Sequence, residues 1–304
     1  MRRLIWMEGE LVPPGRATMP VMGHAAHRGS LVFDFGVFHT TPSGPAVFRL
    51  RDHVRRFLRS TAILGLELGY DAGALVEASR RTVAASELGE GHIRWTAFVP
   101  SPEPDLLPRS PRAHVAIAAY APSDLADEGQ PPAPKPGALR VAVFDDARKA
   151  PPEVFPPLAK IAGAYVGPLI AKRRAVEAGA DEVVLLDADG HVAEAPTSNV
   201  FAVVRGELLT PALGRILDGI TRDSVLAIAR AEGIPAREVA LSRDALESAD
   251  EAFLAASSFP VAPIVSVNGH AMKAGAPGPV TARLKAVLLA AERGADPRFA
   301  AWTA

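Results

Sequence analysis

Lys160 lies in the stretch Pro156-Pro157-Leu158-Ala159-Lys160-Ile161-Ala162-Gly163-Ala164-Tyr165, where it is surrounded by apolar and small residues, with no Asp or Glu within six positions. Burial among such neighbours disfavours the charged ammonium, which lowers the pKa of a lysine and favours the neutral amine that a Schiff base requires. The competing interpretation is a lysine whose stem lies along a helix and whose ammonium reaches the solvent. On this segment alone, the competing interpretation is the better one.

Three further segments carry groups that an anionic, aromatic ligand needs. Glu194 lies between two expected strands, beside small residues that let a planar ligand approach closely. Residues 218–226 lead from a glycine into an expected helix, whose N-terminal amides favour an anion. Ser257 and Ser258 offer hydroxyls after the strand-like residues 252–254. Each segment also has an ordinary structural interpretation, which for Glu194 is a turn acid that caps the backbone after it.

Composition narrows the class of protein. The chain has 304 residues, enough for two domains with cores of their own. Its formal net charge of -1, from 33 basic and 34 acidic residues, gives no field that favours nucleic acid or an anionic membrane. The chain has no cysteine, and we expect no metal site. The first residues lack the apolar run of a signal peptide, so we expect a cytoplasmic protein with small-molecule substrates.

Apolar periodicity predicts two domains of mixed α+β and α/β character. Residues 1–120 form a small α/β domain, 121–137 an interdomain loop rich in Pro, Asp and Gly, and 138–304 a larger domain. The first domain is expected to hold a hairpin at 4–12, strands at 29–38, 93–99 and 114–120, a helix capped by Asp52 and a helix at 74–88.

In the larger domain we expect strands at 139–144, 182–186 and 200–204 and helices at 158–178, 222–232 and 279–293. Its strands follow one another as hairpins more often than they alternate with helices, which argues against a doubly wound parallel sheet. The sequence contains neither G-x-G-x-x-G nor a phosphate-binding G-x-x-x-x-G-K-[ST] loop. Nucleotide cofactors are therefore disfavoured.

Taken together and in order, these segments resemble the branched-chain aminotransferases, which are class IV pyridoxal-phosphate-dependent aminotransferases of fold type IV. The likeness extends over nearly the whole chain and is carried by residues 44–57, Ala159-Lys160, Gly163-Ala164-Tyr165, Glu194 with Asn199-Val200-Phe201, Gly219-Ile220-Thr221-Arg222-Asp223 and Ala249-Asp250-Glu251. The resemblance implies a small N-terminal α/β domain, a larger C-terminal domain with a β-barrel-like core, and a homodimer or larger even assembly.

The resemblance also implies a role for each candidate residue. Pyridoxal 5'-phosphate needs a Schiff-base lysine, an acid at its ring nitrogen, a hydrogen bond to its phenolic oxygen and a phosphate site. By the family pattern, Lys160 binds the cofactor and moves the proton, Glu194 pairs with the ring nitrogen and Tyr165 bonds the phenolic oxygen. The phosphate is implied to bind Arg56, Ile220, Thr221 and Ser257, and Asn199 and Gly219 belong to the same cofactor set.

The expected substrate segment departs from the family pattern. That pattern is usually Tyr-Gly-x-x-x-Phe-Glu-Gly-x-Arg, whereas residues 33–42 are Phe-Asp-Phe-Gly-Val-Phe-His-Thr-Thr-Pro. The family's tyrosine before Ile-Arg is His92, while Arg94 is kept as a carboxylate partner. A hydrogen bond to a charged group contributes about 1.5 to 3 kcal/mol, so its loss changes specificity. The predicted substrate residues are Phe33, Phe38, His39, His92, Arg94, Ser257 and Ser258.

We therefore predict an aminotransferase that moves an amino group from an amino acid or amine to a 2-oxo acid by a ping-pong cycle, with an altered pocket. Three alternatives stay open. Phe38-His39-Thr40-Thr41 is also reminiscent of aminodeoxychorismate lyases, relatives of the same fold that eliminate pyruvate. The second alternative is a transaminase for D-amino acids or (R)-amines. The third is a non-catalytic small-molecule binder.

Overall fold

The structure, a computed structural model, describes residues 3–125 and 137–304. The chain divides into unit 1, residues 1–134, 159–163 and 290–304, and unit 2, residues 135–158 and 164–289. Most of the predicted interdomain loop at 121–137 falls in residues 126–136, outside the described residues, and stays a prediction. Among the described residues, no helix is long and apolar enough to cross a membrane.

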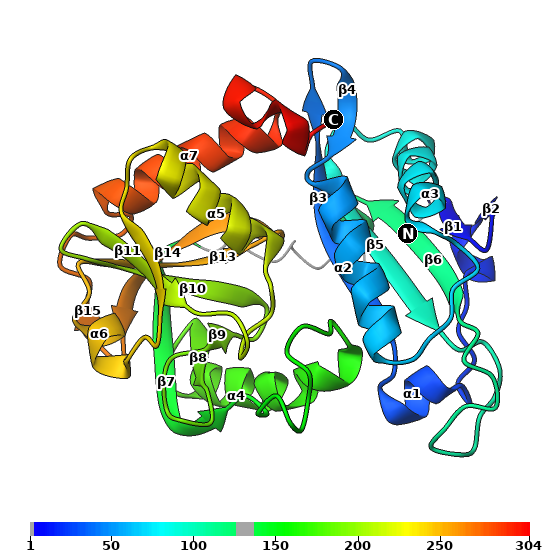
Figure 1. The fold of residues 1–304 in the computed structure, drawn as a ribbon, viewed down its shortest axis with the longest axis horizontal. Coiled ribbons are helices and arrows are strands. Elements are labelled where there is room, and N and C mark those ends of the chain that lie inside the picture. The colour runs from blue at the N-terminus through cyan, green and yellow to red at the C-terminus, as the bar shows by residue number, and fades with distance from the viewer. Residues whose placement is uncertain (1–2, 126–136) are drawn as a thin grey trace. The chain divides into compact units, whose positions relative to one another are not determined.

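Unit 1 is built on a six-stranded antiparallel sheet in the order β2-β1-β6-β5-β3-β4. Its strands are β1 (Ile5–Met7), β2 (Glu10–Val12), β3 (Val32–Thr41), β4 (Gly44–Val47), β5 (Gly91–Phe98) and β6 (His114–Tyr120). Helices α2 (Leu50–Ile63) and α3 (Ala72–Ser86) lie beside this sheet in Figure 1. The unit also contains η1 (Pro14–Arg16), α1 (His24–Arg28), η2 (Pro122–Leu125) and η4 (Pro297–Trp302).

Strand register divides the sheet of unit 1 into two chemically different faces. Phe33 pairs with Thr96 and Phe35 with Arg94, so these four side chains share one face. The alternating residues of β3 and β5 point to the other face, where the Trp95 indole donates to Ser79 of α3 at 2.8 Å. The helix-facing side is thus the core, and the opposite side carries three of the predicted substrate residues, Phe33, His92 and Arg94.

Two predicted starts in unit 1 need correction. Asp52 was expected to cap the helix, but α2 begins at Leu50, and its cap position is Arg49 in the left-handed conformation with φ 52°. The Asp52 carboxylate instead accepts from Arg49 Nε at 2.7 Å, a first-turn ion pair that competes with the backbone amides. Strand β3 begins at Val32 rather than residue 29, because Gly29, with φ 67°, ends α1.

Unit 2 is built on a mixed nine-stranded sheet whose main path is β12-β11-β10-β13-β14-β7-β8. Its strands are β7 (Leu139–Arg148), β8 (Glu182–Leu186), β9 (Glu194–Ala195), β10 (Ser198–Val204), β11 (Glu207–Pro211), β12 (Ala236–Val239), β13 (Glu251–Ala256), β14 (Phe259–Val267) and β15 (His270–Ala271). Strand β9 pairs with β10, and a bridge joins Leu186 at the end of β8 to Val192 just before β9. The sheet therefore curls back toward its own middle like a barrel.

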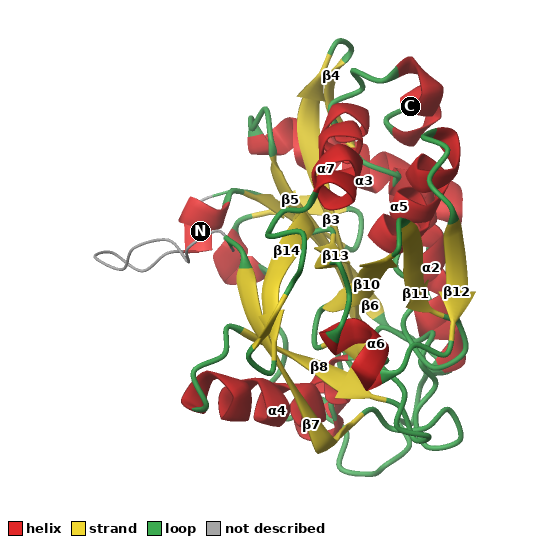
Figure 2. Cartoon of the chain, turned by 90° about the vertical axis from the view of Figure 1, so that its left-hand side faces the viewer, coloured by secondary structure: helices red, strands yellow, loops and turns green. Residues whose placement is uncertain are grey.

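Alternation along the strands gives unit 2 two apolar layers. One face of β7 and β8, with Val141, Val143, Val184 and Leu186, lies inside the curled sheet. The other face, with Val183 and Leu185, packs on α4 (Val166–Glu177), which Figure 2 shows beside these strands. The remaining helices are α5 (Ile220–Ala231), α6 (Arg243–Glu247) and α7 (Pro279–Glu292). This curled core holds β9 and the start of α5 in place.

The segment around Lys160 is not helical, contrary to the predicted helix at 158–178. Its chain first pairs with the start of β3, through the Val32–Ile161 bridge and the bond from Ala162 N–H to the Leu31 carbonyl at 2.8 Å. Helical geometry begins only with η3 (Ala162–Tyr165) and continues in α4. The backbone groups of this segment are taken by a strand edge, so they cannot make a helical ladder.

Candidate active site

Lys160 is held by its backbone on both sides. Its N–H donates to Ser60 Oγ of α2 at 3.0 Å, and its carbonyl accepts from the Phe33 N–H at 3.1 Å. The side chain is half-buried, and its Nζ lies 4.9 Å from the centroid of the Phe33 ring. Contacts with a strand and a helix thus fix the backbone from which this side chain extends.

Arg56 is buried in the middle of α2 and bound to a carboxylate that the sequence did not single out. Its Nε donates to Asp34 Oδ2 at 2.8 Å and its Nη2 to Asp34 Oδ1 at 2.7 Å. Only 6% of Arg56 and none of Asp34 is exposed. The pair is bidentate, which fixes the plane of the guanidinium.

His53 completes this group. Its Nδ1 lies 2.7 Å from Asp34 Oδ1, and its ring stacks on Trp95 at a centroid distance of 5.6 Å. Burial alone would raise the pKa of Asp34, but Arg56 and His53 hold that pKa well below its usual range. Burial lowers the pKa of His53, so the ring is neutral at pH 7 and its Nδ1 donates. The sequence singled out neither Asp34 nor His53 as a site residue.

In unit 2, the Glu194 carboxylate is buried and bonded by three groups. Oε1 is paired with Lys149 Nζ, Oε2 accepts from Asn199 Nδ2 at 3.0 Å, and both oxygens lie within reach of the Leu217 N–H at 3.2 and 3.1 Å. Antiparallel pairing places Glu194 opposite Asn199 in β9 and β10. Lys149 was missed because nothing in its local sequence distinguishes it from a surface lysine.

The start of α5 lies beside the hydroxyl of Ser257. Thr221 Oγ1 is 3.5 Å from Ser257 Oγ, in the turn between β13 and β14. Gly219 stands at the cap position of α5, where a Cβ would collide with the Asn199 side-chain oxygen. Ile220 and Thr221 are the first two residues of the helix, where its dipole favours an anion. This region thus has the donor set of an anion site.

Two further predicted site residues, Tyr165 and Ser258, differ in exposure. Tyr165 is half-buried at the end of η3, in the cap position of α4. Ser258 is exposed, next to the half-buried Ser257.

Three of the predicted substrate residues, Phe33, His92 and Arg94, share the sheet face of unit 1 that points away from its core. The Arg94 guanidinium lies 5.6 Å from the Phe33 centroid and 5.7 Å from the Phe35 centroid. His92 meets Phe35 edge to face at 5.0 Å. Arg94 also lines a hollow of about 230 Å³ with the apolar side chains of Ile5, Met7, Ala17, Met19, Leu31, Phe98, Ala116 and Ala118. Phe38, by contrast, is fully buried in the core.

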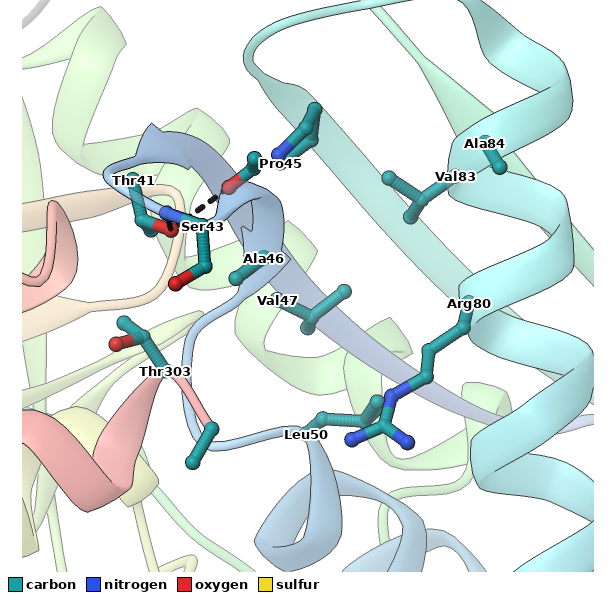
Figure 3. Close-up of a pocket in the computed structure, with 12 residues that line it drawn as sticks. Thr41, Ser43, Pro45, Ala46, Val47, Leu50, Arg80, Val83, Ala84 and Thr303 are labelled. Atoms are coloured by element: carbon teal, nitrogen blue, oxygen red, sulfur yellow. Dashed lines mark hydrogen bonds between the residues drawn. The ribbon is translucent and has the colours of Figure 1, made fainter.

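His39 lies between two carboxyl groups, with Nδ1 3.6 Å from Glu90 and Nε2 3.7 Å from Glu292. Burial, assisted by Arg293, lowers the pKa of His39, while burial raises the pKa of Glu292 to about 8. Both groups are therefore neutral at pH 7. A second hollow of unit 1, of about 410 Å³, is lined by Arg80, Leu50 and Thr303 among others (Figure 3) and by none of the predicted site residues.

The Glu292→Gln variant is expected to be more stable than the parent at pH 8. Because the pKa of Glu292 rises from 4.5 to about 8 on folding, only the folded chain holds this proton between these values, so the free energy of unfolding falls as the pH rises through them. Glutamine removes the fall, and we expect a Tm gain of roughly 5 °C at pH 8. Thermal unfolding at pH 6.5 and 8 measures it. The exposed Glu77→Gln serves as control, and an equal effect of both variants at both pH values would contradict the prediction.

Comparisons with known proteins point to one family. The model of the family described as amino-transferase class IV matches residues 36–267. The branched-chain-amino-acid aminotransferase of Pseudomonas aeruginosa is 33% identical over 299 residues, 98% of this chain and 96% of the relative.

Solved structures agree over the whole chain. A branched-chain aminotransferase of Thermoproteus uzoniensis with norvaline has a TM-score of 0.91 and 32% identity, covering 99% of this chain and 98% of its own. The branched-chain amino acid aminotransferase of Thermobaculum terrenum in its PLP-form has a TM-score of 0.89 and 26% identity, covering 99% of this chain and 97% of its own. Both units of this chain therefore have counterparts in solved branched-chain aminotransferases.

Proposed function

This chain belongs to the class IV aminotransferase family, and we propose that it transfers an amino group from an amino acid to a 2-oxo acid whose side chains differ from those of ordinary branched-chain substrates. The chain is a pyridoxal-phosphate-dependent transaminase of fold type IV. The substrate proposal rests on one observation. The Arg94 guanidinium lines an apolar hollow and lies beside Phe33, at a position where the family pattern has a tyrosine.

The residues present fit the chemistry of the cofactor. When bound, pyridoxal phosphate supplies an electron sink for the substrate's Cα electrons. Glu194 is a carboxylate buried in a fixed position by Asn199 and the Leu217 amide, as a partner of a protonated ring nitrogen must be. In unit 2, Thr221, Ser257 and the N-terminus of α5 offer hydroxyl and amide donors for the phosphate. The family resemblance implies that Arg56 adds a guanidinium.

Lys160 and Tyr165 take the remaining roles. Lys160 would hold the cofactor through its carbonyl carbon and, once a substrate amine has taken that place, its free amine would accept and return the substrate Cα proton. The bonds that the Lys160 backbone makes with Ser60 and Phe33 fix the point from which this side chain reaches the reacting carbons. By the family resemblance, Tyr165 would donate its phenol O–H to the cofactor's phenolic oxygen.

The changed side chains support a changed specificity. Phe33 offers no hydroxyl to a substrate carboxylate, and His92 is packed edge to face between Phe35 and Tyr120 at 5.0 and 5.6 Å. His39 is neutral and engaged near Glu90 and Glu292. Carboxylate binding on this face thus depends on Arg94, and a hollow of small and apolar side chains beside it suits an apolar substrate chain.

The Arg94→Gln variant is expected to raise KM for the amino acid about tenfold or more while cofactor binding is retained. A charged hydrogen bond contributes about 1.5 to 3 kcal/mol, and glutamine keeps a polar group without the charge. Steady-state kinetics against the preferred donor measure this. Arg80→Gln, at the other hollow of unit 1, is the matched control. If the two variants have the same KM, Arg94 does not bind the carboxylate.

The function is tested by a donor screen of the purified holoenzyme. L-amino acids, D-amino acids and (R)-1-phenylethylamine are added one at a time, and the conversion of the cofactor to its pyridoxamine form is followed by its absorbance. We expect conversion by L-amino acids, with a preference different from leucine, isoleucine and valine. Best conversion by one of these three would overturn the altered specificity, and pyruvate release without an acceptor would indicate a lyase. We also propose a cytoplasmic location, from the features of the sequence, and a homodimer, from the family resemblance.

A further inference from the structure

Tyr120, the last residue of β6, is a buried tyrosine to which the proposed chemistry gives no role. Only 6% of it is exposed. Its ring meets the His92 ring edge to face, with the centroids 5.6 Å apart and the planes at 88°. Its hydroxyl makes no hydrogen bond with any residue that the structure describes. Buried phenols normally have a partner, because an unbonded polar group costs free energy when it leaves water. The hydroxyl is therefore a candidate to bind a ligand.

Strand register places Tyr120 beside Arg94 on the substrate face of the sheet, the face that carries Phe33, His92 and Arg94. His92 pairs with Tyr120, and Arg94 pairs with Ala118. Residues directly opposite one another share a face, so the Tyr120 and Arg94 side chains point to the same side as diagonal neighbours. At this spacing, long and aromatic side chains reach one another. A phenol and a guanidinium can thus meet on one group of a ligand.

The substrate face offers hydrogen-bond donors but no negative charge on its central strands. The only acid in β3, β5 and β6 is Asp34, which lies on the core side of the sheet. Arg94 contacts the rings of Phe33 and Phe35 and has no ion pair with a described residue. Burial, assisted by Arg94, lowers the pKa of His92, so this ring is neutral at pH 7. The Arg94 guanidinium is therefore open to a carboxylate of the substrate.

The reactive amine lies near the same face. The centroid of the Phe33 ring is 4.9 Å from Lys160 Nζ and 5.6 Å from the Arg94 guanidinium. A substrate whose Cα lies at Lys160 can therefore extend a carboxylate to Arg94. Phe33 and Tyr120 flank Arg94 along the sheet. Tyr120 thus stands beyond Arg94 as seen from Lys160, and its phenol approaches the carboxylate from the side away from the reacting carbon.

We propose that Tyr120 donates its hydroxyl to the substrate carboxylate that Arg94 binds, so that a phenol and a guanidinium hold one carboxylate together. This inference deepens the proposed function and rests on it for the role of Arg94. Hydrogen bonds to a charged group are shorter and stronger than neutral ones, and two donors fix the direction of the carboxylate as well as its position. The carboxylate is either the one on the substrate Cα or one at the end of the side chain, since both present the same two oxygens to the pair.

The test measures, by calorimetry, the Kd of the holoenzyme for 4-methylvaleric acid and for glutaric acid. Neither acid carries an amino or oxo group, so binding is measured without turnover and does not depend on the preferred donor. The proteins compared are the parent, Tyr120→Phe, Arg94→Gln and the double variant. Phenylalanine removes one oxygen and keeps the ring that packs on His92. Tyr70→Phe is the control, because Tyr70 is a half-buried tyrosine whose ring packs on Trp6.

For Tyr120→Phe we expect the Kd for at least one of the two acids to rise on the order of tenfold or more, as the loss of a hydrogen bond to a charged group implies. A rise that includes 4-methylvaleric acid places the Cα carboxylate at Tyr120, and a rise for glutaric acid alone places a side-chain carboxylate there. Arg94→Gln should weaken binding of the same acid. In the double variant the rise should be smaller than the product of the two single rises, because both donors hold one group. Tyr70→Phe should bind both acids like the parent.

Other outcomes overturn the inference. If Arg94→Gln weakens binding and Tyr120→Phe does not, Arg94 holds the carboxylate without Tyr120, and the proposed function is left intact. If the two single effects multiply in the double variant, the two side chains do not share a carboxylate. If Arg94→Gln leaves both Kd values unchanged, or the parent binds neither acid, the carboxylate role of Arg94 fails together with this inference. The donor screen then decides on the aminotransferase activity by itself.

Discussion

The Lys160→Ala variant is expected to lose transamination by on the order of 10⁴-fold or more and to lose the visible absorbance of the lysine-bound cofactor. Alanine removes both the amine that binds the cofactor carbonyl and the base that moves the Cα proton, and positioned acid–base catalysis alone contributes about 10² to 10⁴-fold. Single-turnover kinetics and absorbance spectra of the purified protein measure the two losses together.

The control for this variant is Lys273→Ala, since Lys273 is a largely exposed lysine whose ion pair with Asp250 spans 3.7 Å. It should keep the parent spectrum and rate. Because alanine at position 160 leaves the backbone bonds to Ser60 and Phe33 intact, the variant should fold and still bind pyridoxal phosphate through its phosphate. A Lys160→Ala protein with the parent spectrum would refute the assignment.

The Glu194→Gln variant is expected to reduce kcat on the order of 10²- to 10³-fold with a smaller change in KM. Glutamine keeps the size of the side chain and can still bond Asn199 and the Leu217 amide, but it has no charge with which to keep the cofactor's ring nitrogen protonated. The loss should therefore fall on the chemical step, which the rate of the half-reaction with excess amino acid measures directly.

The ion pair between Lys149 and Glu194 adds an expected loss of stability to this second prediction. Lys149 pairs with Glu194 Oε1, so in Glu194→Gln the ammonium loses its counter-charge and a modest loss of stability accompanies the loss of rate. Glu207→Gln, which removes a surface partner of Arg237, is the control and should change neither. A Glu194→Gln enzyme with kcat within twofold of the parent would exclude a role at the ring nitrogen.

The local sequence determined most of the secondary structure. Strands β6 and β8 have the predicted bounds, and α5 and α7 begin and end within two residues of prediction. The spacing of apolar residues, alternating in strands and every three or four residues in helices, fixes the face that each element buries. The ordered set of Lys160, Tyr165, Glu194 and Thr221 gave the family, which the comparisons confirm. Taken alone, Lys160 would fit a surface lysine, Tyr165 a core tyrosine and Glu194 an acid that caps a turn.

Contacts between distant parts of the chain decided the rest. The segment around Lys160 reads as helical, yet its backbone groups pair with the start of β3, a competition that no local pattern reveals. The start of α2 was a local error, because the helix already begins at Leu50, so Asp52 lies within its first turn and its carboxylate bonds Arg49.

For Lys160, the sequence predicted the chemical role but not the contacts around the residue. Its own segment favoured a surface lysine, and the role of Lys160 at the cofactor came from the resemblance of the ordered set of segments to the family. Only the tertiary structure brought Asp34 to Arg56 and Lys149 to Glu194, across separations of 22 and 45 residues. Burial turns such charges into obligatory partners, and burial is a property of the folded chain.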